Sequence, residues 1–201
     1  MNASKPSYVF RGFCDDATAR QEGLHCGQRL LGTPERAAAA LGGDIFYVCA
    51  VGDNVVRERL VGRMERLGWK AETVIDPSVL VAPGVVVGVG SYVGALSILS
   101  PAARLGRHSM VNHGCSIGHD SQLGDFAQVC PGGRVSGGAV LGCGAFVGSN
   151  AVVAPGIRIG DWACLGAAGF ALRAIPDGCT AVGNPARVVF ISNAPKSAIF
   201  P

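Results

Sequence analysis

The sequence has few charged residues, few aromatic residues and no long apolar segment. Of its 201 residues, 15% are charged and 6% are aromatic, and the formal net charge is +3. A nucleic-acid-binding protein would show a basic stripe with interleaved aromatic residues, which this chain lacks. No apolar run reaches the roughly 20 residues that cross a bilayer, and MNASKPSYVF has no signal-sequence pattern. We predict a cytoplasmic protein without nucleic-acid partners or membrane insertion.

The eight cysteines form no zinc-site or redox motif. None stands in a Cys-x-x-Cys pair, and most occupy positions where another small apolar residue would serve. We therefore predict free thiols, most of them buried. Hydrophobic residues (49%) and 30 glycines dominate instead, which indicates a folded, turn-rich chain.

The central part of the chain repeats every six residues. A glycine most often follows each aliphatic position, and a small residue usually stands two places before it. A helix has a period of 3.6 and an amphipathic strand a period of two, so neither explains the pattern. It is typical of short strands stacked as a parallel β-helix. The aliphatic positions are Ile75, Val81, Val87, Val93, Leu99, Leu105, Val111, Ile117, Leu123, Val129, Val135, Leu141, Val147, Val153, Ile159 and Leu165.

Three such hexads would make one triangular coil, so that residues 18 apart stack on each other. Residues 75–165 then build about five coils, with the aliphatic residues in three inward columns. The pattern fails at Ala171, and we expect the coils to end near residue 170. The predicted domains are a small α/β domain (1–72), a β-helix (73–170) and a C-terminal loop and tail (171–201).

Residues 1–72 predict alternating strands and helices. YVFRGFCDD and DIFYVCAVGDN are the predicted strands; GTPERAAAALGG predicts a helix with Thr33 as N-cap and Pro34 in its first turn. NVVRERLVGRMERLGW predicts an amphipathic helix. This order favours a small α/β domain with a parallel sheet. We expect the arginines of the second helix to face solvent: Arg57, Arg59, Arg63 and Arg66.

The hexads, the tail IPDGCTAVGNPARVV and the phrase IGHDSQLGDFAQVCPGGRVSGGAVLG resemble the left-handed β-helix acyltransferases. Within them, the chain resembles sugar acetyltransferases of sialic-acid O-acetylation and nucleotide-amino-sugar N-acetylation. The resemblance implies a left-handed parallel β-helix preceded by a small, truncated Rossmann-like domain. It also implies a homotrimer that transfers acetyl from acetyl-CoA, without a metal, to an amino or hydroxyl group of a nucleotide-linked bacterial sugar, as in polysaccharide biosynthesis.

The catalytic residues of that family map onto one phrase of this chain. A histidine followed by an acid is the family's general base, which here is His119 with Asp120. An imidazole ordinarily titrates near neutral pH and suits this task. Gly137 lies 18 residues beyond His119, so the coil period places it one coil above. Its backbone N–H could stabilise the oxyanion of a tetrahedral intermediate.

The resemblance also implies binding residues. Acetyl-CoA would contact Gln128, Ser149 and Ala167, flanked by Gly148 and Gly166, although relatives often have histidine in place of Gln128. The sugar nucleotide would contact Asp15, Asp16 and Gly52, with a secondary role for His113. Relatives usually begin with a further strand and a glycine-rich loop. This chain starts where their second strand would start, so either its acceptor differs or the sequence begins late.

Other interpretations are open. The acids at residues 15 and 16 could simply cap a turn. A metal-dependent lyase like the γ-class carbonic anhydrases could use His108, His113 and His119, but spacings of five and six put them on successive faces. Otherwise His108 is expected at the surface. The third alternative is a noncatalytic trimeric β-helix scaffold.

Overall fold

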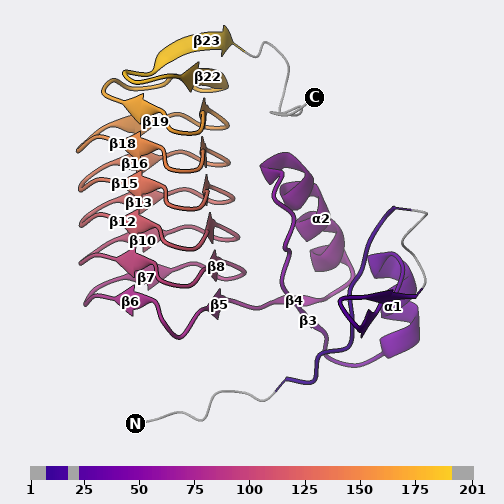
Figure 1. Ribbon diagram of the computed structural model, residues 1–201. Helices are drawn as coiled ribbons and strands as arrows, with labels where there is room; N and C mark the ends of the chain where they lie inside the picture. The colour runs from indigo at the N-terminus through magenta and orange to yellow at the C-terminus, as the bar shows by residue number, and fades with distance from the viewer. Residues whose placement is uncertain (1–7, 18–22, 192–201) are drawn as a thin grey trace. The chain divides into compact units, whose positions relative to one another are not determined.

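The computed structural model describes residues 8–17 and 23–191 of the chain. Contacts group them into two compact units, one running up to Ile45 and including Arg63–Lys70, the other containing Phe46–Gly62 and the chain from Ala71 onward. The second unit contains a β-solenoid of about six turns, whose coils stack from β5 to β21 and end at β22 and β23 (Figure 1). The predicted β-helix is confirmed.

Three parallel sheets form the faces of the solenoid. Face 1 contains β6 (Leu80–Val81), β9 (Ile98–Leu99), β12 (Ser116–Ile117), β15 (Arg134–Val135), β18 (Val152–Val153) and β21 (Phe170–Ala171). Face 2 contains β7 (Val86–Val87), β10 (Arg104–Leu105), β13 (Gln122–Leu123), β16 (Val140–Leu141) and β19 (Arg158–Ile159). Face 3 contains β5 (Val74–Ile75), β8 (Tyr92–Val93), β11 (Met110–Val111), β14 (Gln128–Val129), β17 (Phe146–Val147), β20 (Cys164–Leu165) and β22 (Cys179–Val182), with β23 (Arg187–Ile191) antiparallel at its end.

The strands pair with an offset of 18 residues, as the three-hexad coil predicts. Ile117, for example, lies between Leu99 below and Val135 above, in parallel register. From Val93 to Leu165 the second residue of each strand points inward and is buried, which builds one continuous aliphatic core. The pattern continues one strand further than expected, since Ala171 also pairs in register with Val153 and is buried.

Three corner columns connect the faces. The His119 corner joins face 1 to face 2 (residues 82–85, 100–103, 118–121, 136–139, 154–157 and 172–175). The Asp125 corner joins face 2 to face 3 (residues 88–91, 106–109, 124–127, 142–145 and 160–163). The Ser149 corner joins face 3 to face 1 (residues 94–97, 112–115, 130–133, 148–151 and 166–169).

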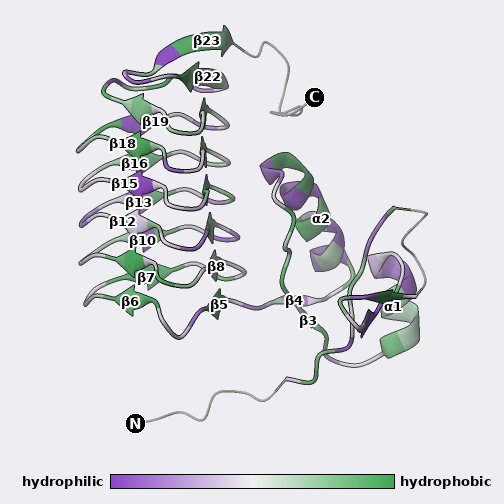
Figure 2. Cartoon of the chain, in the orientation of Figure 1, coloured by the Kyte–Doolittle hydropathy of each residue, from purple (hydrophilic) through white to green (hydrophobic). Residues whose placement is uncertain are grey.

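The chain before the coils contains two helices. α1 (Pro34–Leu41) begins as predicted, because the Thr33 hydroxyl accepts the N–H of Arg36 at 3.3 Å. α2 (Asn54–Arg66) is also confirmed, and it carries both hydrophilic and hydrophobic residues along its length (Figure 2). The carboxylate of Asp53 caps it by accepting the N–H groups of Val55 and Val56, both at 2.9 Å.

The strands of this region are shorter than predicted. β1 (Leu24–His25) and β2 (Gln28–Arg29) form an antiparallel hairpin that the sequence did not indicate, and the predicted first strand is reduced to a parallel bridge between Phe13 and Leu30. β3 (Phe46–Tyr47) and β4 (Lys70–Ala71) are two residues each. Among the described residues, no helix is both long and apolar enough to cross a membrane.

The Asp125 corner has glycine where an aromatic ring covers the backbone. Gly144 has φ +62°, and a Cβ placed on it would overlap the Trp162 ring one coil above. Gly156, in the His119 corner, has φ +69°, but its Cβ would meet nothing within 4 Å. The two glycines therefore share the left-handed backbone and differ in the space above it.

We predict that Gly156→Ala destabilises the fold by about 1 kcal/mol, the cost of a left-handed L-residue. Gly144→Ala should cost about 1–3 kcal/mol more, because its methyl group overpacks against the indole. Urea denaturation of both variants measures the difference. Equal losses would show that the ring yields freely.

Candidate active site

His119 and Asp120 lie together in the turn between β12 and β13. His119 Nδ1 is 2.8 Å from Asp120 Oδ2, and the side chains are 70% and 68% exposed. Adjacent residues of a strand point to opposite sides, but Asp120 has φ +59°, and at this corner the two side chains meet. With Nδ1 occupied by the carboxylate, Nε2 is the ring nitrogen left for a substrate.

Gly137 stacks directly on this imidazole, as the 18-residue period predicts. A Cβ on Gly137 would overlap Nε2 of His119 and come within 2.9 Å of its Cδ2. The backbones are also tied together, because the N–H of Gly138 donates to the carbonyl of His119 at 2.8 Å. Any side chain at residue 137 would therefore displace the ring from its place.

The backbone N–H of Gly137 differs from its equivalents in other coils. In the Asp125 corner, the N–H groups of Arg107 and Cys143 donate to aspartates one coil above, at 2.7 Å and 3.0 Å. In the His119 corner, the equivalent residues 83, 101 and 155 are prolines, which have no N–H. The N–H of Gly137 has neither solution, and within the described part of the chain no acceptor takes it. It is a free donor beside the imidazole.

The Ser149 corner carries a second column of free donors. Ser149 and Ala167 stack on successive coils, and no described residue accepts either backbone N–H. Their glycine neighbours serve the stacking, since a Cβ on Gly148 would come within 2.5 Å of the nitrogen of Ala167, and one on Gly166 within 2.8 Å of Val182. His113 is exposed two coils below Ser149.

Gln128 lies on face 3 and is only 5% exposed. Its Oε1 accepts a hydrogen bond from Nη1 of Arg57 at 3.0 Å, and its Nε2 lies 3.6 Å from Sγ of Cys130. The amide is thus held by the protein itself, and its contact with CoA stays a prediction.

Arg57 is the residue that sequence reasoning missed. The expectation of a solvent-facing side chain is wrong for it, because it is 1% exposed. A signal was present: Arg57 shares an i, i+4, i+7 stripe with Val61 and Met64, both buried.

The acids proposed for the sugar nucleotide have partners in their own unit. Asp15 Oδ1 accepts the N–H of Ala17 at 2.8 Å, which is the turn-capping contact. Asp16 pairs with the Arg63 guanidinium, which also donates to both oxygens of Glu35, and these hydrogen bonds lower the pKa of Glu35 to about 2. In the other unit, Gly52 is exposed, and a Cβ there would meet nothing within 4 Å.

The histidines of the lyase alternative do not gather. His113 and His119 occupy the Ser149 and His119 corners, while His108 is in the Asp125 corner. His108 is buried and stacks on Phe126 with centroids 5.3 Å apart, so its predicted surface position is wrong. Across residues 8–17 and 23–191, no three His, Cys, Asp or Glu side chains form a group that could hold a metal ion.

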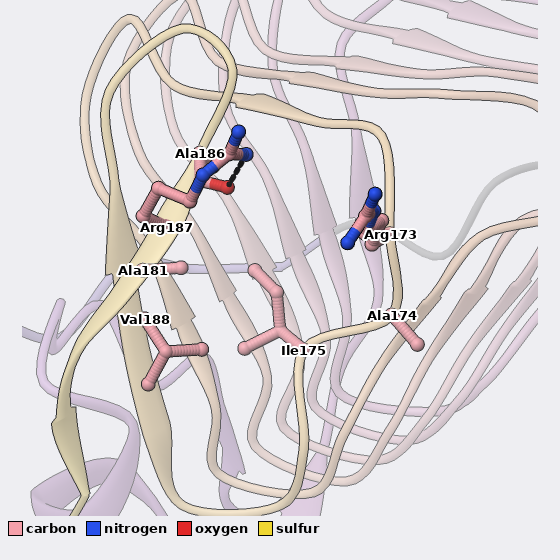
Figure 3. A pocket seen from close by; sticks show the side chains of 7 residues that line it. All are labelled: Arg173, Ala174, Ile175, Ala181, Ala186, Arg187 and Val188. Carbon is pink, nitrogen blue, oxygen red and sulfur yellow. Dashed lines mark hydrogen bonds between the residues drawn. The ribbon is translucent and has the colours of Figure 1, made fainter.

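A cavity of about 170 Å³ lies at the closing end of the coils (Figure 3). Ile175, Ala181 and Val188 give it an apolar wall, and Arg173 and Arg187 supply two cations. Nη1 of Arg187 donates to the carbonyl of Ala186 at 3.3 Å. Arg173 stands in the same corner as His119, three coils further on. The sequence analysis did not single out this cavity.

No protein-family model matches the sequence, and no curated protein matches it; the similarities come from solved structures. The acetyltransferase domain of PglB from Neisseria gonorrhoeae, in complex with acetyl coenzyme A, is 30% identical with a TM-score of 0.81, over 89% of this chain and 85% of that one. A histidine-to-asparagine mutant of perosamine N-acetyltransferase from Caulobacter crescentus, in complex with CoA and GDP-perosamine, is 29% identical with a TM-score of 0.79, over 86% and 82%. WeeI from Acinetobacter baumannii is 26% identical with a TM-score of 0.78, over 89% and 85%.

These similarities extend through both the coils and the chain before them, and the fold agrees with the family that the hexads and the histidine-acid phrase indicated. The chain belongs to the left-handed β-helix, hexapeptide-repeat family of sugar acetyltransferases.

Proposed function

We propose that this protein transfers the acetyl group of acetyl-CoA to the amino group of a nucleotide-linked sugar. The observation that carries the proposal is one corner where an acid-supported imidazole lies against a glycine with a free N–H. Support also comes from the similar structures, which contain acetyl-CoA, or CoA with GDP-perosamine, and include substitutions of a histidine.

The transfer is direct, within a ternary complex. The sugar amine attacks the thioester carbonyl, a C–N bond forms, and Nε2 of His119 takes the proton that the amine loses. Asp120 orients the ring through Nδ1 and stabilises the imidazolium. The N–H of Gly137 donates to the carbonyl oxygen as it becomes negative. When the intermediate collapses, the C–S bond breaks, and His119 returns the proton to the CoA thiolate.

We further propose that two copies build each active site, within a homotrimer. The free donors of Ser149 and Ala167 lie one corner away from His119, across face 1. Six residues of chain separate neighbouring corners, at most about 20 Å. The Ser149 corner of one protomer would meet the His119 corner of the next around acetyl-CoA, with Gln128, Gly148 and Gly166 supporting the cofactor side. Exposed apolar residues on face 1, such as Leu80 (65% exposed) and Ile98, suit such an interface.

The phosphates of CoA would reach the cavity at the end of the coils. Three coils separate Arg173 from His119, or about 14 Å at the usual spacing of paired strands. A pantetheine arm running along the corner covers such a length. Arg173 and Arg187 would then face the phosphates, with which a guanidinium makes charge-assisted hydrogen bonds.

We assign the acceptor nucleotide to residues 1–72, coil chemistry to residues 73–170 and closure to residues 171–201. Gly52 would approach the nucleotide through its backbone, while Asp15, Asp16 and His113 would bind polar groups of the acceptor. The proposal places the reaction in the cytoplasm, where the eight free cysteines stay reduced.

The proposed function predicts acetyl-CoA-dependent thiol release with an amino sugar linked to UDP, GDP or CMP, including GDP-perosamine. A thiol reagent follows CoA, and mass spectrometry identifies the acetylated sugar. Acetylation of free amino sugars alone, or of none, would reject a nucleotide-linked acceptor.

His119→Ala serves as the catalytic control of that screen. Loss of the general base should lower kcat by about 10²–10⁴-fold. His25→Ala, which removes an exposed histidine outside the coils, should leave kcat unchanged. Retained activity in a folded His119→Ala protein would reject the mechanism.

Gly137→Ala tests the position of the imidazole. The φ of Gly137 lies outside the left-handed region, so the backbone accepts alanine, but the methyl group overlaps His119. We predict a kcat lower by about 10²-fold, the cost of misplacing a catalytic group, with a melting temperature close to wild type. A normal kcat would show that the ring position is unimportant.

The shared site predicts complementation between two inactive variants. His119→Ala damages one corner and Ala167→Trp the other, so a mixed trimer can contain one site with both corners intact. Random reassembly should restore about a quarter of wild-type activity, since each site draws its two corners independently from two subunits. A mixture as inactive as its components would place both corners in one chain.

A further inference from the structure

A buried arginine without an acidic partner lies at the start of α2. Arg57 donates to the carbonyls of His108 (Nε, 3.2 Å), Val51 (Nη1, 2.9 Å) and Phe126 (Nη2, 2.7 Å), and to Gln128 Oε1 (Nη1, 3.0 Å). In the described part of the chain, no carboxylate forms an ion pair with it. Burial lowers its pKa to about 10, which leaves it charged at neutral pH.

An uncompensated buried charge is an expensive way to pack a helix. Burying two ions is often no more stabilising than apolar side chains of the same volume, and a single ion without a counter-charge is worse placed. What the guanidinium offers instead is a rigid planar fork whose N–H groups fix several acceptors in one geometry. The relevant question is therefore which groups Arg57 holds in place.

The acceptors come from two parts of the unit. The carbonyls of His108 and Phe126 belong to the Asp125 corner and lie 18 residues apart, on successive coils. Asn54 extends the attachment to the next coil by donating to the carbonyls of Gly144 (3.0 Å) and Ala145 (3.4 Å). The remaining carbonyl, that of Val51, precedes the helix. Arg57 thus ties the loop before α2 to the solenoid.

Gly52 is held from both sides by these contacts. The residue before it, Val51, accepts from Arg57, and the residue after it, Asp53, caps α2 through its carboxylate. Yet Gly52 itself is exposed, has no left-handed φ, and would accept a Cβ with nothing within 4 Å. The fold does not require glycine here, while it immobilises the peptide. A bare, rigid backbone is suited to close approach by a ligand.

We propose that Arg57 is a positioning residue of the acceptor site, which fixes the Val51–Asp53 loop on the coils so that Gly52 meets the nucleotide. The inference rests on the proposed function, which assigns Gly52 to the sugar nucleotide. Gln128 acts in the same anchor by supplying the fourth acceptor. Arg57 does not touch the reacting atoms, so its loss should affect acceptor binding and not the chemical step.

Arg57→Lys keeps the charge and removes the fork. We expect the KM for the nucleotide sugar that scores highest in the UDP, GDP and CMP screen to rise about tenfold, as a loss of hydrogen bonds to a charged group implies. The kcat and the KM for acetyl-CoA should stay within about twofold. Arg59→Lys is the matched control, an exposed arginine of the same helix, and should change none of the three. An unchanged KM for the sugar, or an equal loss in all three constants, would overturn the proposal.

Hydrogen exchange of the unliganded proteins tests the positioning without an acceptor. Arg57→Lys should speed exchange at the amides of Gly52 and Asp53, while exchange in the coils stays as in wild type. Gln128→Leu, which removes one acceptor and keeps Arg57, is the milder second variant and should show a smaller change at the same amides. Unchanged exchange in both variants would reject the role of Arg57. A wild-type protein inactive with all nucleotide sugars would instead reject the proposed function, whatever the exchange shows.

Discussion

The register of the parallel sheets is the constraint on which the rest of this structure depends. Each strand N–H donates to a carbonyl 17 or so residues ahead, as Gly118 does to Val135 at 2.7 Å. Because every coil has the same length, residues far apart in sequence stack in columns. A column is therefore a chemical unit, and the contact between His119 and Gly137 follows directly from the pairing of Ile117 with Val135.

The three corners show how one backbone serves different purposes. Aspartates accept corner N–H groups in the Asp125 corner, and prolines remove them from three coils of the His119 corner. Where neither device is present, at Gly137, Ser149 and Ala167, donors are left for a ligand. The proposed site is thus where the solenoid leaves its own hydrogen bonds unmade, in keeping with the tendency of functional sites to break local rules.

The sequence predicted the coils well because a six-residue period has few structural solutions. It also predicted α1 through Thr33 and Pro34, and the stacking of residues 119 and 137. It failed for Arg57 and His108, whose residue types are usually exposed. Both are buried because α2 and the Asp125 corner meet, which is a tertiary contact. The strands before the coils were overestimated for a related reason, since their extent depends on pairing partners that the chain itself does not name.

By itself, then, the sequence determined the β-helix, its period and the composition of each column, because these follow from local spacing and from hydrogen bonds that repeat identically. Only the tertiary structure decided which side chains meet across a corner, which N–H groups stay free, and where a charged side chain can be buried. Those outcomes depend on the left-handed turn at Asp120, on the aspartates and prolines of neighbouring coils, and on the docking of α2. Each of them brings together groups from distant parts of the chain, and no local pattern specifies such a contact.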